Sequence, residues 1–266
     1  MEITGLSAIV AGNASGLAGA TARMLAARGA HVTIFDLDAE EGRKIAAEIG
    51  GHFMTVDIAD DASVAAAFED AEERYGLARI LVSCVGIAPP ARTIGKDRLP
   101  YAFDLFRKGI DINSVGIFDP LSRFTARLIA AEPVGGERGI IINTAALAGY
   151  HGRIGQTTYA SSKAGVVGLT LCAARGLAEH RIRVVTISHG AFMAPTTTDV
   201  PQAARQSQGK QAPQAVRLGR PEQYAKLVED VIGNPMLNGD VIGLDGATVL
   251  PGIGIAASAD VRWPAA

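Results

Sequence analysis

The chain has 266 residues, 48% of them hydrophobic, which is enough for one large α/β domain with a substantial buried core, or for two small ones. Its formal net charge of −2 and the absence of a basic or acidic block argue against a nucleic-acid partner and against a charged tail. Two cysteines without metal-ligand spacing, no signal-peptide pattern and no apolar run of 18 residues favour a cytoplasmic protein with no bound metal and no membrane partner.

Short apolar runs alternate with longer amphipathic segments along the chain. The expected strands are Ala8–Ala11, His31–Phe35, Phe53–Val56, Ile80–Cys84, Ile140–Asn143, Arg183–Ile187 and Val241–Leu244. The expected helices are Ala18–Arg28, Ala39–Ile49, Asp61–Tyr75, Ala102–Ala130, Ser161–His180 and Pro221–Ile232. Most strands lack in-out alternation, which is typical of strands that are covered on both faces. The pattern predicts a single-domain, doubly wound Rossmann fold of class α/β, with about seven parallel strands flanked by helices on both faces.

A glycine-rich turn follows the first expected strand. Gly12 and Gly16 allow backbone amides to approach a pyrophosphate closely, and the following helix N-terminus supplies partial positive charge. Asp36 ends the second strand, 20 residues after Gly16, where a carboxylate can accept the ribose hydroxyls of an adenosine. The same charge would repel a 2′-phosphate, and no Arg or Lys occurs at 13–15 or directly after Asp36. These residues favour NAD over NADP, although a purely structural turn is the simpler alternative for the glycines alone.

Tyr159 and Lys163 lie four residues apart early in an apolar helical run, so they share one helix face. A neighbouring ammonium favours the phenolate and lowers the pKa of a tyrosine. The pair could therefore exchange a proton with an alcohol or a carbonyl. Taken alone, the same spacing is compatible with packing and a solvated charge.

Five motifs in a fixed order resemble the short-chain dehydrogenase/reductase family. They are Gly12-x-x-x-Gly16, Asp57 after the third strand, Cys84-Val85-Gly86 after the fourth, Asn113, and Tyr159-x-x-x-Lys163. The resemblance runs from Leu6 to about Gly246. Residues 139–145, 155–156 and 234–246 are most similar to the type-2 3-hydroxyacyl-CoA dehydrogenases, the 17β-hydroxysteroid dehydrogenase type 10-like subfamily.

The resemblance implies NAD-dependent interconversion of a secondary alcohol and its ketone in a homotetramer, with a hydroxyacyl-CoA, a hydroxysteroid or a similar hydrophobic alcohol as the substrate. Tyr159 would be the general acid/base, Lys163 would lower its pKa and bind the nicotinamide ribose, and Asn113 would hold a relay water. The residues expected at the cofactor are Gly12, Ser15, Gly16, Leu17, Asp36, Asp57, Ile58, Cys84, Gly86, Tyr159, Lys163 and Phe192. Those expected at the substrate are Gln156, Tyr159 and His151, next to a substrate lid around residues 191–218.

The family's catalytic serine maps onto Ala146, and other positions also depart from the family pattern. His189-Gly190 replaces a Pro-Gly, and Ala194 replaces the threonine that usually holds the carboxamide. Loss of one preorganised donor at a developing oxyanion costs ~2.7–4 kcal/mol. Thr144 shares the strand face of Ala146, but its oxygen would lie several ångströms from the required place. Three interpretations follow: an engineered Ser-to-Ala variant, a divergent enzyme that uses another donor such as His151 or His189, or an NAD-binding homologue with weak or no catalysis.

Overall fold

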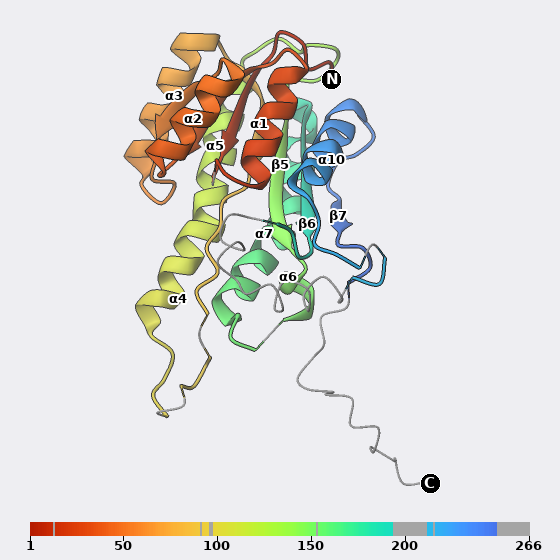
Figure 1. The fold of residues 1–266 in the computed structure, drawn as a ribbon. Helices are drawn as coiled ribbons and strands as arrows, with labels where there is room; N and C mark the ends of the chain where they lie inside the picture. Colours follow the sequence, from red (N-terminus) through yellow and green to blue (C-terminus); the bar gives the residue numbers. More distant parts are fainter. Residues whose placement is uncertain are drawn as a thin grey trace.

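A computed structural model describes residues 1–12, 14–90, 92–95, 98–152, 154–193, 212–214 and 216–248. Its seven strands form one parallel sheet in the order β3-β2-β1-β4-β5-β6-β7. The ribbon in Figure 1 shows the helices packed alongside this sheet. The strands are β1 Ser7–Ala11, β2 His31–Asp36, β3 His52–Thr55, β4 Ala78–Ser83, β5 Gly139–Ala146, β6 Ile182–His189 and β7 Val241–Leu244. The predicted fold class is confirmed.

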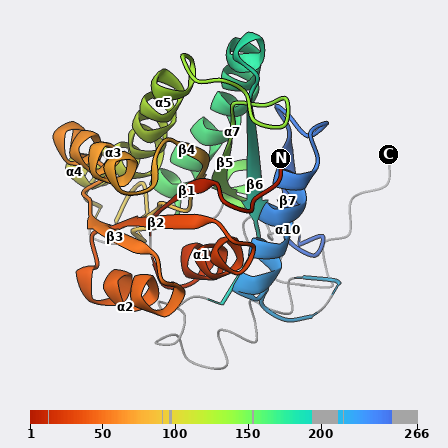
Figure 2. The ribbon, with the colours of Figure 1, turned by 90° about the horizontal axis from the view of Figure 1, so that it is seen from above.

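Helices cover both faces of the sheet, which is clearest when it is seen from above (Figure 2). The helices are α1 Leu17–Ala27, α2 Ala39–Ile49, α3 Asp61–Tyr75, α4 Phe103–Ile110, α5 Gly116–Leu128, α6 Ala148–His151, α7 Thr157–Leu177 and α10 Pro221–Gly233. One buried apolar cluster joins the sheet to α1, α2 and α10, and a second joins it to α3, α5 and α7. Both faces of the strands are therefore apolar, which explains why their sequences lack alternation. No helix of this described part is long and apolar enough to cross a membrane.

Three element boundaries differ from the sequence prediction in ways that matter for the site. The single helix expected over Ala102–Ala130 is divided by a π-helical turn, η1, at Asp111–Val115. Helix α7 begins at Thr157 rather than at Ser161, so Tyr159 lies in its first turn. Strand β5 continues past Asn143 to Ala146, because pairing with β6 outweighs the low strand propensity of alanine.

The strand order reverses between β1 and β4, and ligands of open α/β sheets bind at such a switch point. The chain leaves β1 at Gly12 with a φ of +91°, a conformation that favours glycine. A Cβ at Gly12 would lie 2.7 Å from the Cα of Val85, which follows β4. The fold thus brings two backbone segments into close contact at the carboxyl edge of the sheet.

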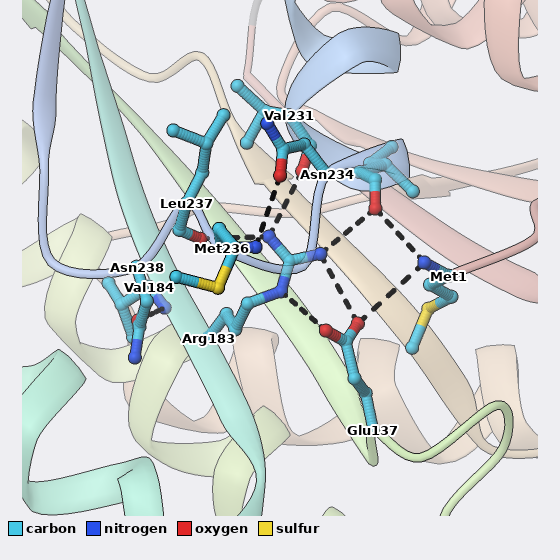
Figure 3. A network of polar contacts seen from close by, with 10 residues as sticks. Met1, Glu137, Arg183, Val184, Val231, Asn234, Met236, Leu237 and Asn238 are labelled. Atoms are coloured by element: carbon cyan, nitrogen blue, oxygen red, sulfur yellow. Dashed lines mark hydrogen bonds and ion pairs between the residues drawn. The ribbon is translucent and has the colours of Figure 1, made fainter.

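Arg183, near the start of β6, is the centre of a network of polar contacts at the edge of the sheet opposite to the carboxyl edge (Figure 3). Its Nε and Nη2 donate to the carboxylate of Glu137 at 2.8 and 3.2 Å. The remaining N–H groups donate to the carbonyls of Val231, Ile232 and Leu237 at 2.9–3.0 Å. All five guanidinium donors are therefore paired. The network fastens the end of α10 to the sheet at the edge far from the glycine turn.

The expected lid falls mostly outside the described residues, which include only 191–193, 212–214 and 216–218 of that range. Ala194 also lies outside them. Among the residues that are described, no group of three or more His, Cys, Asp or Glu side chains could hold a metal ion.

Candidate active site

A cavity of about 750 Å³ runs along the carboxyl edge of the sheet from the glycine turn to Tyr159. Its volume is in the range of small-molecule sites. The predicted site residues that line it are Gly12, Asp36, Asp57, Ile58, Gly86 and Tyr159. Residues from the first turn, three strand ends and α7 therefore meet at one cavity.

The glycine turn forms a cradle at one end of this cavity. Gly16 has a φ of +75° and directly precedes α1, so the helix N-terminus faces the turn. The backbone N–H of Ala14 donates to Oδ2 of Asp36, which ties the turn to the end of β2. Backbone amides at a helix N-terminus suit a phosphate group, and the close approach at Gly12 leaves no space for a side chain.

The cavity wall carries negative charge. Asp36, Asp38 and Asp57 line it, and the described lining residues include no Lys or Arg. Asp36 Oδ1 accepts a hydrogen bond from the N–H of Asp38 at 3.2 Å, and Asp57 Oδ1 accepts one from the N–H of Ala59 at 2.9 Å. Because a carboxylate has about four acceptor sites, lone pairs remain for a ligand. This wall suits hydroxyl donors and disfavours an additional phosphate.

Lys163 is buried behind the cavity. Its Nζ donates to the carbonyls of Val85 at 2.9 Å and Thr144 at 2.8 Å, and burial lowers its pKa to about 8. An ammonium has three donors, so a third N–H is available for another acceptor. A Cβ at Gly86 would lie 3.2 Å from Nζ. Gly86, which lines the cavity, therefore brings its backbone close to the ammonium where a side chain would crowd it.

Tyr159 is partly buried where it lines the cavity. The centre of its ring is 5.9 Å from Lys163 Nζ. Burial raises the pKa of Tyr159 to about 12, the opposite of the lowering predicted from its spacing to Lys163. The ammonium directs two of its N–H groups to backbone carbonyls, and desolvation of the phenolate outweighs its charge. A phenol with this pKa is protonated at neutral pH.

Asn113 is fully buried in the π-helical turn η1. Its Nδ2 donates to the Ile87 carbonyl at 2.8 Å and to Ser162 Oγ at 2.9 Å, and its Oδ1 accepts the N–H of Ile87 at 2.8 Å. Asn113 thus joins the segment after β4 to α7. Both of its amide hydrogens are used within the protein, and its relay water stays a prediction.

Ala146 is buried at the end of β5, and its partner in the β6 register is His189. Thr144 does not replace the missing hydroxyl, because its Oγ1 lies 2.6 Å from the hydroxyl of Tyr224. His189 Nδ1 donates to the carbonyl of Gly190 at 2.7 Å, and burial lowers the pKa of His189 to about 4. A neutral imidazole with its proton on Nδ1 has none on Nε2 to give. The interpretation of His189 as a proton donor near neutral pH is therefore wrong.

Several predicted residues do not line the large cavity, as far as the described residues define it. Cys84 directs its Sγ to the hydroxyl of Tyr224, at 3.8 Å. Phe192 lines a separate cavity of about 210 Å³. Lys163, Asn113 and Ala146, described above, do not line it either. The remaining residues are Ser15, Gly16 and Leu17 of the glycine turn, and Gln156 and His151 before α7.

Tyr224 is the contact residue that the sequence prediction missed. It lies in the amphipathic pattern of α10, 80 residues from Thr144, and resembles an ordinary core aromatic there. The only local signal is that a buried tyrosine hydroxyl usually has a hydrogen-bond partner.

Comparison with known proteins places this geometry among related enzymes. Residues 7–205 match the family model described as short chain dehydrogenase. The 3-hydroxyacyl-CoA dehydrogenase type-2 of Drosophila melanogaster is 41% identical over 244 residues, covering 90% of this chain and 95% of that protein. The human protein of the same name is 39% identical over 250 residues, covering 92% and 96%. The crystal structure of 3-hydroxyacyl-CoA dehydrogenase type-2 from Mycobacterium avium superposes with a TM-score of 0.89 at 39% identity, covering 93% and 97% of the two chains.

Proposed function

The chain belongs to the short-chain dehydrogenase family of oxidoreductases, and from this premise we propose that it interconverts a 3-hydroxyacyl-CoA and its ketone with NAD. The observation that carries the proposal is the cavity that joins the glycine cradle to Tyr159. The substrate class comes from the names of the similar proteins, and a hydroxysteroid or a similar hydrophobic alcohol is compatible with the same chemistry.

The residues present fit a dinucleotide. The glycine turn would hold the pyrophosphate, Asp36 the adenosine ribose, Asp57 the adenine amino group and Lys163 the second ribose. When bound, the nicotinamide ring supplies the hydride acceptor or donor. The choice of NAD over NADP is supported by the three lining carboxylates, and by the absence of a basic side chain among the described lining residues.

Tyr159 would exchange the proton of the substrate oxygen. In the reductive direction its protonated phenol would donate to the carbonyl oxygen of the substrate. In the oxidative direction the phenolate accepts the alcohol proton, and the Lys163 ammonium, 5.9 Å from the ring centre, would offset part of the cost of burying that phenolate. Ala146 adds no hydroxyl beside the substrate oxygen, so catalysis should be weaker by about 10²–10³ than with that donor present.

An activity assay tests the enzyme proposal. Wild type and Tyr159→Phe are supplied with NAD and either a 3-hydroxyacyl-CoA or a hydroxysteroid, and NADH formation is followed by absorbance. We expect turnover by wild type and a loss of about 10²-fold or more in the variant, because the proton-transfer group is removed.

No NADH above the Tyr159→Phe rate would contradict the enzyme proposal. If NADH binding were retained, the result would favour the second candidate, an NAD-binding homologue with weak or no catalysis. The observation behind this second candidate is Ala146, which has a methyl group where the family has its catalytic serine. Tighter binding of NADPH than of NADH would contradict the choice of cofactor.

We also propose a homotetramer and a cytoplasmic location. Exposed apolar side chains on two neighbouring outer helices, Phe118 of α5 and Leu171 of α7, support burial against further copies. A monomeric mass in solution would contradict the assembly, and the location is tested by cell fractionation.

A further inference from the structure

Tyr224 places a hydroxyl between the ends of two neighbouring strands. It projects from α10 and is completely buried. Its hydroxyl lies 2.6 Å from Oγ1 of Thr144 on β5 and accepts a hydrogen bond from Sγ of Cys84, directly after β4, at 3.8 Å. A phenolic hydroxyl has one donor and two acceptor sites, so it can satisfy both partners at once.

The same two strand ends hold Lys163. One acceptor of its Nζ is the carbonyl of Thr144 itself, at 2.8 Å. The other is the carbonyl of Val85, the residue after Cys84, at 2.9 Å. Each backbone segment that binds the ammonium is therefore also bound by the hydroxyl of Tyr224 through a side chain.

A buried hydroxyl is not required for packing at this place. Removing a hydroxyl from water costs free energy unless it is hydrogen-bonded, and a phenylalanine would fill a core position without that cost. A fully paired network in a low-dielectric interior fixes the geometry of its members. Two N–H groups of Lys163 are held by the carbonyls, and their directions determine where the third N–H points.

We propose that Tyr224 is a positioning residue, whose hydroxyl fixes the carbonyls of Thr144 and Val85 so that Lys163 is directed past Gly86 into the cavity. This role rests on the proposed function only in that Lys163 serves the reaction at Tyr159. The hydroxyl acts through the two backbone segments and does not itself touch the cavity residues.

The test compares Tyr224→Phe and Thr144→Val with a matched control, Thr170→Val. Thr170 Oγ1 lies 2.6 Å from Thr186 Oγ1, so it forms an equally short and equally buried hydroxyl pair. It lies on α7 like Lys163 but does not contact the acceptors of Nζ. Thr144→Ser retains the hydroxyl and serves as the conservative variant.

NADH binding is measured by fluorescence across pH, together with the unfolding temperature. We expect Tyr224→Phe and Thr144→Val to weaken NADH binding by about five- to ten-fold, because a buried hydroxyl loses its partner. In both variants the loss of NADH binding at alkaline pH should also begin at a pH about half a unit lower, because the buried ammonium loses a fixed acceptor. The other titratable groups around Nζ are Tyr159, Cys84 and His189, and none of them is substituted in these variants. Loss of a hydrogen-bond partner raises the pKa of the Cys84 thiol, which keeps that thiol neutral at neutral pH. Thr144→Ser should resemble wild type. Thr170→Val should have a lower unfolding temperature but the same pH profile of NADH binding as wild type.

A Tyr224→Phe variant that behaves like Thr170→Val, with lower stability and the wild-type pH profile of NADH binding, would overturn the positioning role. If wild type bound no NADH, that result would contradict the proposed function alone. Crystal structures of wild type and Tyr224→Phe would then decide. Displacement of Lys163 Nζ from the Thr144 carbonyl supports the positioning role, and retention of both carbonyl bonds refutes it.

Discussion

Ala146 places a methyl group at the end of β5, close to the other predicted site residues. Tyr159 borders the cavity, Lys163 is held behind it by two carbonyls, and Asn113 joins the adjoining segments. The position next to Ala146 on β6 is taken by His189, whose pKa burial lowers to about 4, so that its imidazole is neutral at pH 7. The rate of the reaction should therefore depend on whether a hydroxyl at position 146 can donate a hydrogen bond to the substrate oxygen.

Ala146→Ser is expected to raise kcat ten-fold or more, because one added donor at a developing oxyanion contributes ~2.7–4 kcal/mol when its geometry is right. Turnover of the 3-hydroxyacyl-CoA and NADH affinity are measured for both proteins, and only kcat should change greatly. Ala145→Ser is the control, because it adds a hydroxyl one residue away on the opposite strand face. An equal rate for wild type and Ala146→Ser would show that the site no longer uses this position.

Sequence spacing predicted residues that line the cavity, but it did not predict Tyr224, which contacts the strand ends behind the cavity. Gly12, Asp36 and Tyr159 follow from motifs a few residues long, and all three line the cavity. Tyr224 was missed because its partner Thr144 is brought to it only by the packing of α10 on the sheet. The direction of the Tyr159 pKa was also wrong, because the sequence shows a neighbouring charge but not the burial that outweighs it.

At the scale of elements, prediction was best where amphipathic patterns end at clear signals. Helices α2 and α3 have the predicted bounds, and each begins after an aspartate that accepts backbone N–H bonds. The π-helical turn η1 was not predicted, because its residues continue the helical pattern on both sides. Its cause is tertiary: Asn113 bonds with Ile87 and Ser162.

The Arg183 network should stabilise the fold without serving the site. Arg183→Met is expected to lower the free energy of unfolding by about 3–5 kcal/mol, because it leaves the carboxylate of Glu137 without its buried partner. Denaturant unfolding measures this loss. NADH affinity should change little, because Arg183 lies near the start of β6 while the cavity lies at the carboxyl ends of the strands. Arg123→Met is the control: its pairs with Asp119 and Asp61 lie at the surface, where about 1 kcal/mol or less is expected. Similar losses for the two variants would contradict a structural role specific to Arg183.

At the scale of the whole molecule, the parallel sheet followed from strand–helix alternation, because right-handed crossovers leave few other arrangements. The lid prediction stays untested, since its sequence has little periodicity and residues 194–211 and 215 all lie outside the described residues. Three groups at the same end of the sheet have displaced pKa values: Lys163, which is buried, and His189 and Tyr159, which are partly buried. Their common cause is burial, so the site end of the molecule should show a measurable link between pH and stability.

His189 gives the clearest case of that link. Its pKa is about 4 in the folded protein and about 6.5 when unfolded, so the unfolded chain binds more protons between these values. The folded state should lose stability as pH falls from 6.5 to 4, by up to about 3 kcal/mol from this residue. Denaturant unfolding at pH 7 and pH 4 is compared for wild type and His189→Gln. Carboxylates contribute equally to both proteins, so the variant should lose less stability on acidification. An identical loss in the two proteins would show that His189 is protonated in the folded state as readily as in the unfolded chain.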